Sequence, residues 1–420
     1  MKERRKMSLA AQIFIGLAFG IIAGLLFMAG GLTDFTVEYI KPFGTIFLNL
    51  IKFIVVPIVL TSIIVGVISM RDIRKVGSIG WKTIVFYLST TACAVVIGLV
   101  FANIFKGTFK VLQTSGLEYE AGEPVKFMDT LVNIFPSNIV QPMVDATMLQ
   151  VIVIALFFGF GIILAGPKAK PLADVVTSLA DVSMVIMELI LKLSPIGVFC
   201  LITPVVAENG SAVLGSLAMV LLAAYICYVI HMAVVYSLSV RTLAKISPIA
   251  FFKGMAPAMA MAFSSASSVG TLPLNMECTE KLGAKRDIAS FVLPLGATIN
   301  MDGTAIYQGV CSVFIASCFG IDLTLTQMVT IVLTATLASI GTAGVPGSGM
   351  IMLAMVLQSV GLPVEGIALV AGVDRIFDMG RTTVNITGDA ACTLAVSRME
   401  ERKEQRKLRK QNASAGSSAE

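Results

Sequence analysis

AGVDRIFDMGRTTVNITGDAACTLA, residues 371–395, would pass for a membrane-spanning helix if its charged residues were removed. At about 100° per residue, one face of this helix carries five polar side chains within an arc of roughly 80°. They are Asp374, Asp378, Arg381, Asn385 and Asp389. Charges inside a bilayer are costly and usually mark an ion or substrate path. The stretch therefore predicts a buried functional helix, and the alternative is a soluble core helix with paired charges.

The composition predicts an all-α polytopic membrane protein with a single domain over 1–420. The chain is 56% hydrophobic and 14% charged, with mean hydropathy +0.89, whereas soluble domains are about 25% charged. Its Lys and Arg residues gather at the chain ends and in short loops, so the net charge of +5 indicates topology and no nucleic-acid partner. We expect a multi-pass protein of the cell membrane with cytoplasmic N- and C-termini.

Charge-poor runs predict six spans in the first part of the chain, at 8–33, 42–70, 83–105, 127–165, 171–206 and 209–240. Pro136 and Pro142 predict a break in the fourth span. The segment 106–126 is a candidate exposed loop. The tail 397–420 is polar and charged, which predicts a disordered cytoplasmic end.

Beyond residue 245 two apolar segments are interrupted at their centres, by SSASSVGT at 264–271 and by SIGTAGVPGSG at 339–349. The second tip holds four glycines and one proline, which would break a helix in mid-membrane. One long helix or two ordinary spans are alternatives, but we predict two re-entrant helical hairpins. Each precedes a polar helix, at 288–321 and 371–395. This arrangement predicts inverted repeats and eight spans in all.

The polar residues of these segments suit an acidic amino acid. Arg381 offers a planar fork for a carboxylate, and Asp378 offers a partner for an ammonium group. The hairpin tips add helix N-terminal amides, which favour a second carboxylate. The alternative for Asp378 and Arg381 is a structural salt bridge.

Oxygen-bearing side chains also favour monovalent cations. Asp302 and Asp389, with Asn300 and Asn385, supply carboxylate and amide oxygens, and Thr298, Tyr87, Thr90 and Thr91 could add hydroxyls. His231 is expected to be a packed residue. No HExxH, GxSxG or P-loop motif occurs, so the chain is not expected to be an enzyme.

Five segments resemble the dicarboxylate/amino acid:cation symporter family, which includes archaeal aspartate transporters and mammalian excitatory amino acid carriers. They are FLNLIKFIVVPIVLTSIIVGV (47–67), SSVGTLP (267–273), FVLPLGATINMDGTAIY (291–307), SIGTAGVPGSG (339–349) and FDMGRTTVNITGD (377–389). The resemblance implies a homotrimer that imports L-aspartate and/or L-glutamate with co-transported sodium. It also implies an elevator mechanism, with a scaffold at about 8–70 and 127–206 and a transport domain at about 83–105 and 209–396.

By motif position, the resemblance implies that Arg381 holds the substrate side-chain carboxylate and Asp378 the amino group. The other implied substrate contacts are Thr382, Asn385, Thr304, Ser268, Val345 and Gly347. One sodium site would comprise Asp389, Asn385, Asn300 and Gly296. A second would comprise Thr298, Ser339, Ile340 and Thr342, and a third Asp302, Asn300, Tyr87, Thr90 and Thr91.

Two departures from relatives bear on function. Archaeal relatives carry an arginine in the first tip where this chain has Ala266, and Arg375 in the last helix places a cation near the substrate instead. Mammalian carriers have a glutamate linked to proton transport where this chain has Gln308. Retaining Asp378 and Arg381 disfavours neutral amino acids and amine-free dicarboxylates. Proton-coupled glutamate or C4-dicarboxylate symport is the alternative, and an ion channel is the alternative class.

Overall fold

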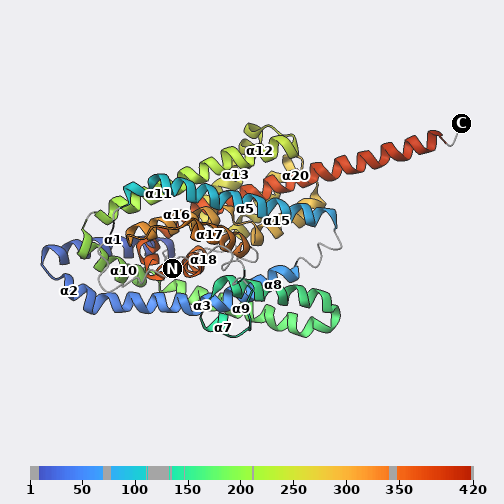
Figure 1. Cartoon of the computed structure of the whole chain (residues 1–420). Coiled ribbons are helices and arrows are strands. Elements are labelled where there is room, and N and C mark those ends of the chain that lie inside the picture. Colours follow the sequence, from blue (N-terminus) through green and yellow to red (C-terminus); the bar gives the residue numbers. More distant parts are fainter. Residues whose placement is uncertain are drawn as a thin grey trace, which may run out of the picture.

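The computed structural model describes residues 9–69, 77–109, 111, 132, 135–145, 147–210, 212–339 and 348–417, and the regular structure within these ranges is helical. Figure 1 shows long helices running side by side. Five helical segments of the described chain are long and apolar enough to cross a membrane. They are Ala11–Ala29, Thr33–Ile68, Ser78–Thr108, Gln150–Lys192 and Gly215–Ala244. The prediction of an all-helical membrane protein is confirmed.

One group of helices packs around α3 (Lys41–Ser69). Helices α8 (Met148–Ala165), α9 (Lys170–Lys192) and α10 (Ser194–Asn209) pack directly on α3, and α1 (Leu9–Ala29) joins the group by packing on α10. Short elements α2 (Thr33–Phe35) and η1 (Thr36–Ile40) lead into α3, and α7 (Gln141–Val144) precedes α8. The expected break in the fourth span is confirmed by the separation of α7 from α8.

The expected fifth span at 171–206 is two helices instead of one. Helix α9 ends at Lys192 and α10 begins at Ser194, with Pro195 in its first turn. Proline lacks the N–H that would continue the helix but is tolerated in a first turn. Before α9, η3 (Gly166–Ala169) begins at Gly166, whose φ of 64° turns the chain back along α3.

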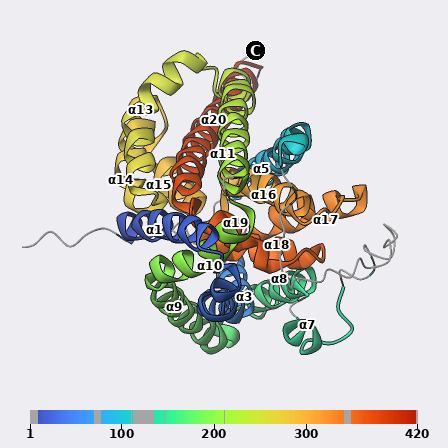
Figure 2. The same cartoon turned by 90° about the vertical axis from the view of Figure 1, so that its left-hand side faces the viewer.

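A second group of helices surrounds α20 (Asp374–Ser417). Figure 2 shows α13, α14, α15 and α20 on one side of the molecule and α3, α8 and α9 on the other. This group contains α5 (Ser78–Phe105), which packs on α16, and η2 (Lys106–Thr108). It also contains α11 (Ala212–His231), followed by η4 (Met232–Tyr236), α12 (Ser237–Ser239) and η5 (Val240–Ala244).

Two pairs of packed antiparallel helices occupy the positions of the expected hairpins, and their re-entrant course in the membrane stays a prediction. In the first, α13 (Pro248–Ser265) and α14 (Ser268–Lys281) meet at Ala266, which has a left-handed backbone with φ of 50°. In the second, α17 (Leu325–Ala338) packs on α18 (Ser348–Ser359). Most of the second tip, residues 340–347, lies outside the described residues.

The expected helix 288–321 is broken at its centre. Helix α15 (Arg286–Ile299) ends before Asn300, whose backbone is extended, and α16 (Asp302–Cys318) begins two residues later. Asp302 stands in the first turn of α16, where a carboxylate is favoured by the helix dipole. The break frees backbone groups between two buried helices. Such breaks are tolerated in membranes where the freed groups line a polar site.

The last helix begins later and continues further than the sequence predicts. After η6 (Val364–Gly366) and α19 (Ile367–Ala371), the chain bends at Gly372 and α20 starts at Asp374. Helix α20 then extends beyond the other helices to Ser417 (Figure 1). The structure describes the tail, which the sequence predicts to be disordered, as helical up to Ser417.

The composition of the tail explains this difference. Residues 398–410 read RMEERKEQRKLRK, which is rich in strong helix formers. Arg398 pairs with Glu401 at 2.8 Å, one turn along the helix. Glu400 accepts hydrogen bonds from Lys82 at 2.6 Å and from Ser78 at 2.7 Å, both in α5. The start of the tail is thus fixed to the helix group beside it.

Candidate functional site

The polar stripe predicted on 371–395 faces the protein interior. Its five residues, Asp374, Asp378, Arg381, Asn385 and Asp389, are all buried, with exposed fractions between 1% and 6%. They lie on α20, which α13, α14, α15 and α16 surround. The stripe divides into two clusters whose centres lie about two turns apart along α20.

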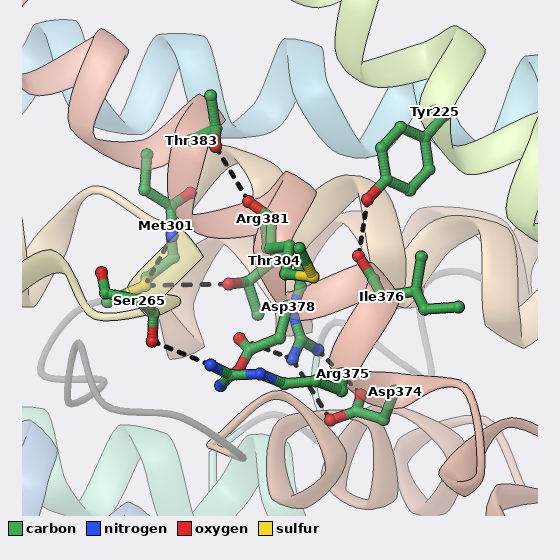
Figure 3. A network of polar contacts seen from close by, with 12 residues as sticks. Tyr225, Ser265, Met301, Thr304, Asp374, Arg375, Ile376, Asp378, Arg381 and Thr383 are labelled. Atoms are coloured by element: carbon green, nitrogen blue, oxygen red, sulfur yellow. Dashed lines mark hydrogen bonds and ion pairs between the residues drawn. The ribbon is translucent and has the colours of Figure 1, made fainter. Parts of the chain in front are cut away.

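The first is the arginine cluster, which consists of Asp374, Arg375, Asp378 and Arg381 (Figure 3). Arg381 Nη1 lies 3.2 Å from Asp374 Oδ1, and Arg381 Nη2 donates to Asp378 Oδ1 at 2.8 Å. Arg375 Nη1 lies 3.7 Å from Asp378 Oδ2. Asp378 therefore lies between two guanidinium groups. Asp374 has no role in the sequence-based assignment beyond its place on the stripe, and its pairing with Arg381 is a new finding.

Three residues from other helices shape the space around Arg381. The Tyr307 ring of α16 lies beneath the guanidinium, with 4.3 Å from Cζ to the ring centroid. Gly303, also in α16, packs so closely that a Cβ there would overlap the Arg381 backbone. A Cβ at Gly349 in α18 would overlap the guanidinium. Both glycines thus allow other helices to approach Arg381.

The first hairpin tip contacts the arginine cluster. Arg375 Nη2 donates to the Ser265 carbonyl at 3.0 Å, as Figure 3 shows. Ser267 caps α14 by accepting from the Gly270 N–H at 3.0 Å, and the next residue, Ser268, is buried. The N-terminus of α14, predicted to hold a carboxylate, therefore lies next to a residue tied to Arg375.

Two further predicted substrate residues lie on the same buried elements. Thr304 is buried in the first turn of α16, and its hydroxyl contacts Met301 Sδ at 3.8 Å. Thr382 is buried on α20, next to Arg381.

The second is the aspartate cluster, which consists of Asn300, Asp302, Asn385 and Asp389. Asn300 Nδ2 donates to Asp389 Oδ1 and to the Asn385 carbonyl, both at 2.9 Å. Asn385 Oδ1 accepts from the Gly303 N–H at 2.8 Å. The broken helix α15–α16 is thereby joined to α20 through its polar break. The structure brings together the residues predicted to form one cation site.

Asp302 has a hydrogen-bonding environment that the sequence predicts only in part. Thr91 donates to its Oδ1 at 2.6 Å, as expected for a shared site. Tyr236 donates to its Oδ2 at 2.7 Å, and His231 Nε2 lies 3.2 Å from the same oxygen. His231 is buried, which confirms its expected packing, but its contact with Asp302 does not follow from the sequence. Neither His231 nor Tyr236 lies in a motif that would have linked it to Asp302.

Gly296 and Tyr87, from these two predicted cation sites, also lie against the aspartate cluster. A Cβ at Gly296 would overlap both Asp389 Oδ1 and the Tyr87 hydroxyl. Thr90 donates to the Tyr87 carbonyl at 3.1 Å. Asn300 Oδ1 is buried and finds no hydrogen-bond partner among the described residues. An unpartnered oxygen beside two buried carboxylates fits a hard monovalent cation.

Of the second predicted sodium site, the structure describes only Thr298 and Ser339. Thr298 bonds to the Leu295 carbonyl at 2.9 Å, and Ser339 bonds to the Thr336 carbonyl at 2.7 Å, each within its own helix or its end. Ile340 and Thr342 lie outside the described residues, as do Val345 and Gly347, which were assigned to the substrate carboxylate. This site stays a prediction.

The sequence of this chain is similar to those of known transporters. The family described as "Sodium:dicarboxylate symporter family" matches residues 9–399. The "Proton/sodium-glutamate symport protein" of Geobacillus stearothermophilus is 38% identical over 405 residues, which cover 94% of this chain and 95% of the relative. The "Proton/glutamate-aspartate symporter" of Escherichia coli is 35% identical over 96% of this chain and 95% of the relative. The "C4-dicarboxylate transport protein" of Bacillus subtilis is 30% identical over 94% of each chain.

Proposed function

Since the chain belongs to the sodium:dicarboxylate symporter family, we propose that it is a secondary active transporter importing L-aspartate and/or L-glutamate with sodium. The family is one of transporters and not of enzymes. The observation that carries the proposal is the pair of clusters on one buried face of α20. The arginine cluster suits an acidic amino acid, and the aspartate cluster, whose centre lies about two turns further along α20, supplies oxygen atoms that suit cations.

Substrate binding is an exchange of partners in the arginine cluster. Arg381 already holds two carboxylates, Asp374 and Asp378, so its fork is shaped for an incoming carboxylate. The substrate side-chain carboxylate takes up part of this fork. Asp378 then loses part of its contact with Arg381, and the ammonium group of the substrate compensates the Asp378 carboxylate instead. The main-chain carboxylate lies at the N-terminal amides of the first hairpin, next to Ser268, and at the second tip.

Sodium binds at the aspartate cluster in this proposal. Asp389, Asn300 and the backbone near Gly296 form one site, and Asp302 with Thr91 forms the neighbouring one. Asn385 links the two clusters, because it follows Arg381 by one turn and also bonds the start of α16. Sodium binding there orders the helix that carries the substrate residues. Occupancy of the two clusters is then thermodynamically coupled.

Transport follows an elevator mechanism in this proposal. The helices around α3 form a scaffold, and those around α20 form the transport domain of a homotrimer in the cell membrane with cytoplasmic termini. Helix α18 packs on α3, and Lys52 of α3 pairs with Glu365 beside α19, so these contacts must change as the transport domain moves.

A binding titration tests this function. Purified full-length protein is titrated with L-aspartate and L-glutamate at several sodium concentrations, with choline replacing sodium at constant ionic strength. Micromolar binding that tightens with sodium and vanishes in choline is the expected result. Absence of binding to either amino acid in every alkali salt would refute the proposal. Saturable uptake and counterflow in vesicles, as opposed to substrate-independent conductance, separate the carrier from a channel.

Proton coupling is the second candidate, and two observations favour it. The names of two relatives described above contain the word proton, and one of these names also contains the word sodium. An imidazole can carry a proton, and His231 Nε2 lies 3.2 Å from Asp302 Oδ2. Uptake that persists in choline and follows an imposed pH gradient would establish it.

A further inference from the structure

Arg375 occupies a position between the first hairpin and the substrate residues. It is the second residue of α20, and its side chain is 18% exposed. Its guanidinium donates to the carbonyl of Ser265, the last residue of α13. The C-terminal carbonyls of a helix form the negative end of its dipole, where a cation is favoured. Arg375 therefore anchors the hairpin tip to α20 (Figure 3).

The same guanidinium also balances charge at Asp378. Asp378 Oδ2 lies 3.7 Å from Arg375, while Asp378 Oδ1 accepts from Arg381 at 2.8 Å. Arg381 is itself divided between Asp378 and Asp374. With two carboxylates and two guanidinium groups, the cluster has a formal charge of zero, and without Arg375 its formal charge would be −1.

This charge balance bears on which substrates the site accepts. An acidic amino acid brings two carboxylates and one ammonium group, so it offers Asp378 a partner. A dicarboxylate of the same chain length without an amine, such as succinate, offers none. If Arg381 alone compensated Asp378 and Asp374, an amine-free dicarboxylate such as succinate would meet uncompensated negative charge.

We propose that Arg375 determines how strictly the site requires an amino group, because it compensates Asp378 when the substrate brings no ammonium. This inference rests on the proposed function and specifies its substrate class. Arg375 acts as a positioning residue through Asp378 and the Ser265 carbonyl. It makes the wild-type protein accept amine-free C4-dicarboxylates as weaker ligands, contrary to what Asp378 and Arg381 predict by themselves.

Competition binding tests the proposal. Labelled L-aspartate is displaced by unlabelled L-aspartate and by succinate at saturating sodium, and the ratio of the two half-inhibitory concentrations is measured. Arg375→Gln should raise the succinate-to-aspartate ratio by about tenfold or more, since a unit charge about 4 Å away is removed. Arg375→Met serves as a second neutral variant. Arg375→Lys should keep the ratio within about threefold, because it restores the charge.

Control variants and the wild type separate the outcomes. Arg398→Gln removes a guanidinium from the same helix, outside the cluster, and should leave the ratio unchanged. Equal weakening of both ligands in Arg375→Gln and Arg375→Met would mean a purely structural role and would overturn the inference. Failure of succinate to displace aspartate from the wild type at any concentration would overturn it as well. A wild type that binds no aspartate would instead refute the proposed function.

Discussion

The two clusters on α20 differ in how their charges are balanced. In the arginine cluster, carboxylates and guanidinium groups pair with one another, so the buried charges are compensated within the protein. In the aspartate cluster, Asp302 and Asp389 form no ion pair with lysine or arginine in the described chain. Buried charge without a partner is costly. In the proposed function, the first cluster therefore exchanges partners with a charged substrate, whereas an added cation completes the second.

The largest expected effect comes from breaking the arginine cluster at its centre. Arg381→Cys removes the carboxylate fork and leaves Asp374 and Asp378 without their common partner. Binding of aspartate and glutamate should weaken by about a thousandfold or more, as expected when one partner of a buried charged pair is lost. A small neutral amino acid such as serine should bind instead. Calorimetric titration with the three amino acids measures this, and normal aspartate binding by the variant would refute the assigned role of Arg381.

Breaking the aspartate cluster should change the dependence on cations. Asp389→Asn removes a carboxylate that Asn300 contacts at 2.9 Å but leaves Arg381 unchanged. The sodium concentration for half-maximal aspartate binding should rise by about tenfold to a hundredfold, because the charge that attracts the cation is gone. Binding at very high sodium should recover. Asp322→Asn, an exposed carboxylate paired with Lys106, is the control. An unaltered sodium dependence in Asp389→Asn would exclude Asp389 as a sodium ligand.

A pair of glycine substitutions tests whether the clusters are separate. Gly349→Ala directs a methyl group at the Arg381 guanidinium, whereas Gly296→Ala directs one at Asp389 and Tyr87. Each change displaces polar atoms by a few tenths of an ångström or more, which should cost about tenfold in affinity. We expect Gly349→Ala to weaken aspartate binding at saturating sodium, and Gly296→Ala to raise the sodium concentration that half-maximal aspartate binding requires. If both variants gave the same profile in the two titrations, the division into clusters would be wrong.

The sequence predicts the residues of the clusters better than their partners. The stripe on α20 follows from helical spacing alone, because side chains three and four residues apart share a face. The motif positions also bring Asn300 next to Asp389. Spacing within one helix cannot reveal that His231 and Tyr236 approach Asp302, since these contacts depend on how separate helices pack.

Local backbone changes were harder to predict. The break at Asn300 leaves a run of apolar residues on both sides, so hydropathy alone indicates one continuous helix. High charge favours disorder in the tail, whereas the Arg398–Glu401 pair within α20 and the Lys82–Glu400 pair between α5 and α20 favour the helix that the structure describes. Both differences arise where polar groups find partners that sequence composition does not show.

The smallest effect is expected at a third position on α20 that belongs to neither cluster. Burial alone would raise the pKa of Glu400, but hydrogen bonds from Lys82 and Ser78 outweigh it, so the pKa of this carboxyl lies below its ordinary value. A lowered folded-state pKa stabilises the protein above the unfolded-state pKa, and this stabilisation is lost as pH falls through the folded-state value. Glu400→Gln should therefore lower the free energy of unfolding at pH 7 by about 1 kcal/mol.

The pH dependence and a matched variant make this prediction specific. Thermal unfolding in detergent should show a Tm lower by about 2 °C for Glu400→Gln at pH 7. The difference should shrink as pH falls below the ordinary range of glutamate and disappear once the pH is below the lowered folded-state pKa of Glu400, where the wild-type carboxyl is protonated as well. Glu277→Gln, which breaks an exposed pair with Lys281 one turn away, should change Tm less. Aspartate affinity and sodium dependence should stay at wild-type values in both variants, because these carboxylates anchor helices and contact neither cluster. A changed sodium requirement in Glu400→Gln would show that the tail is coupled to the aspartate cluster.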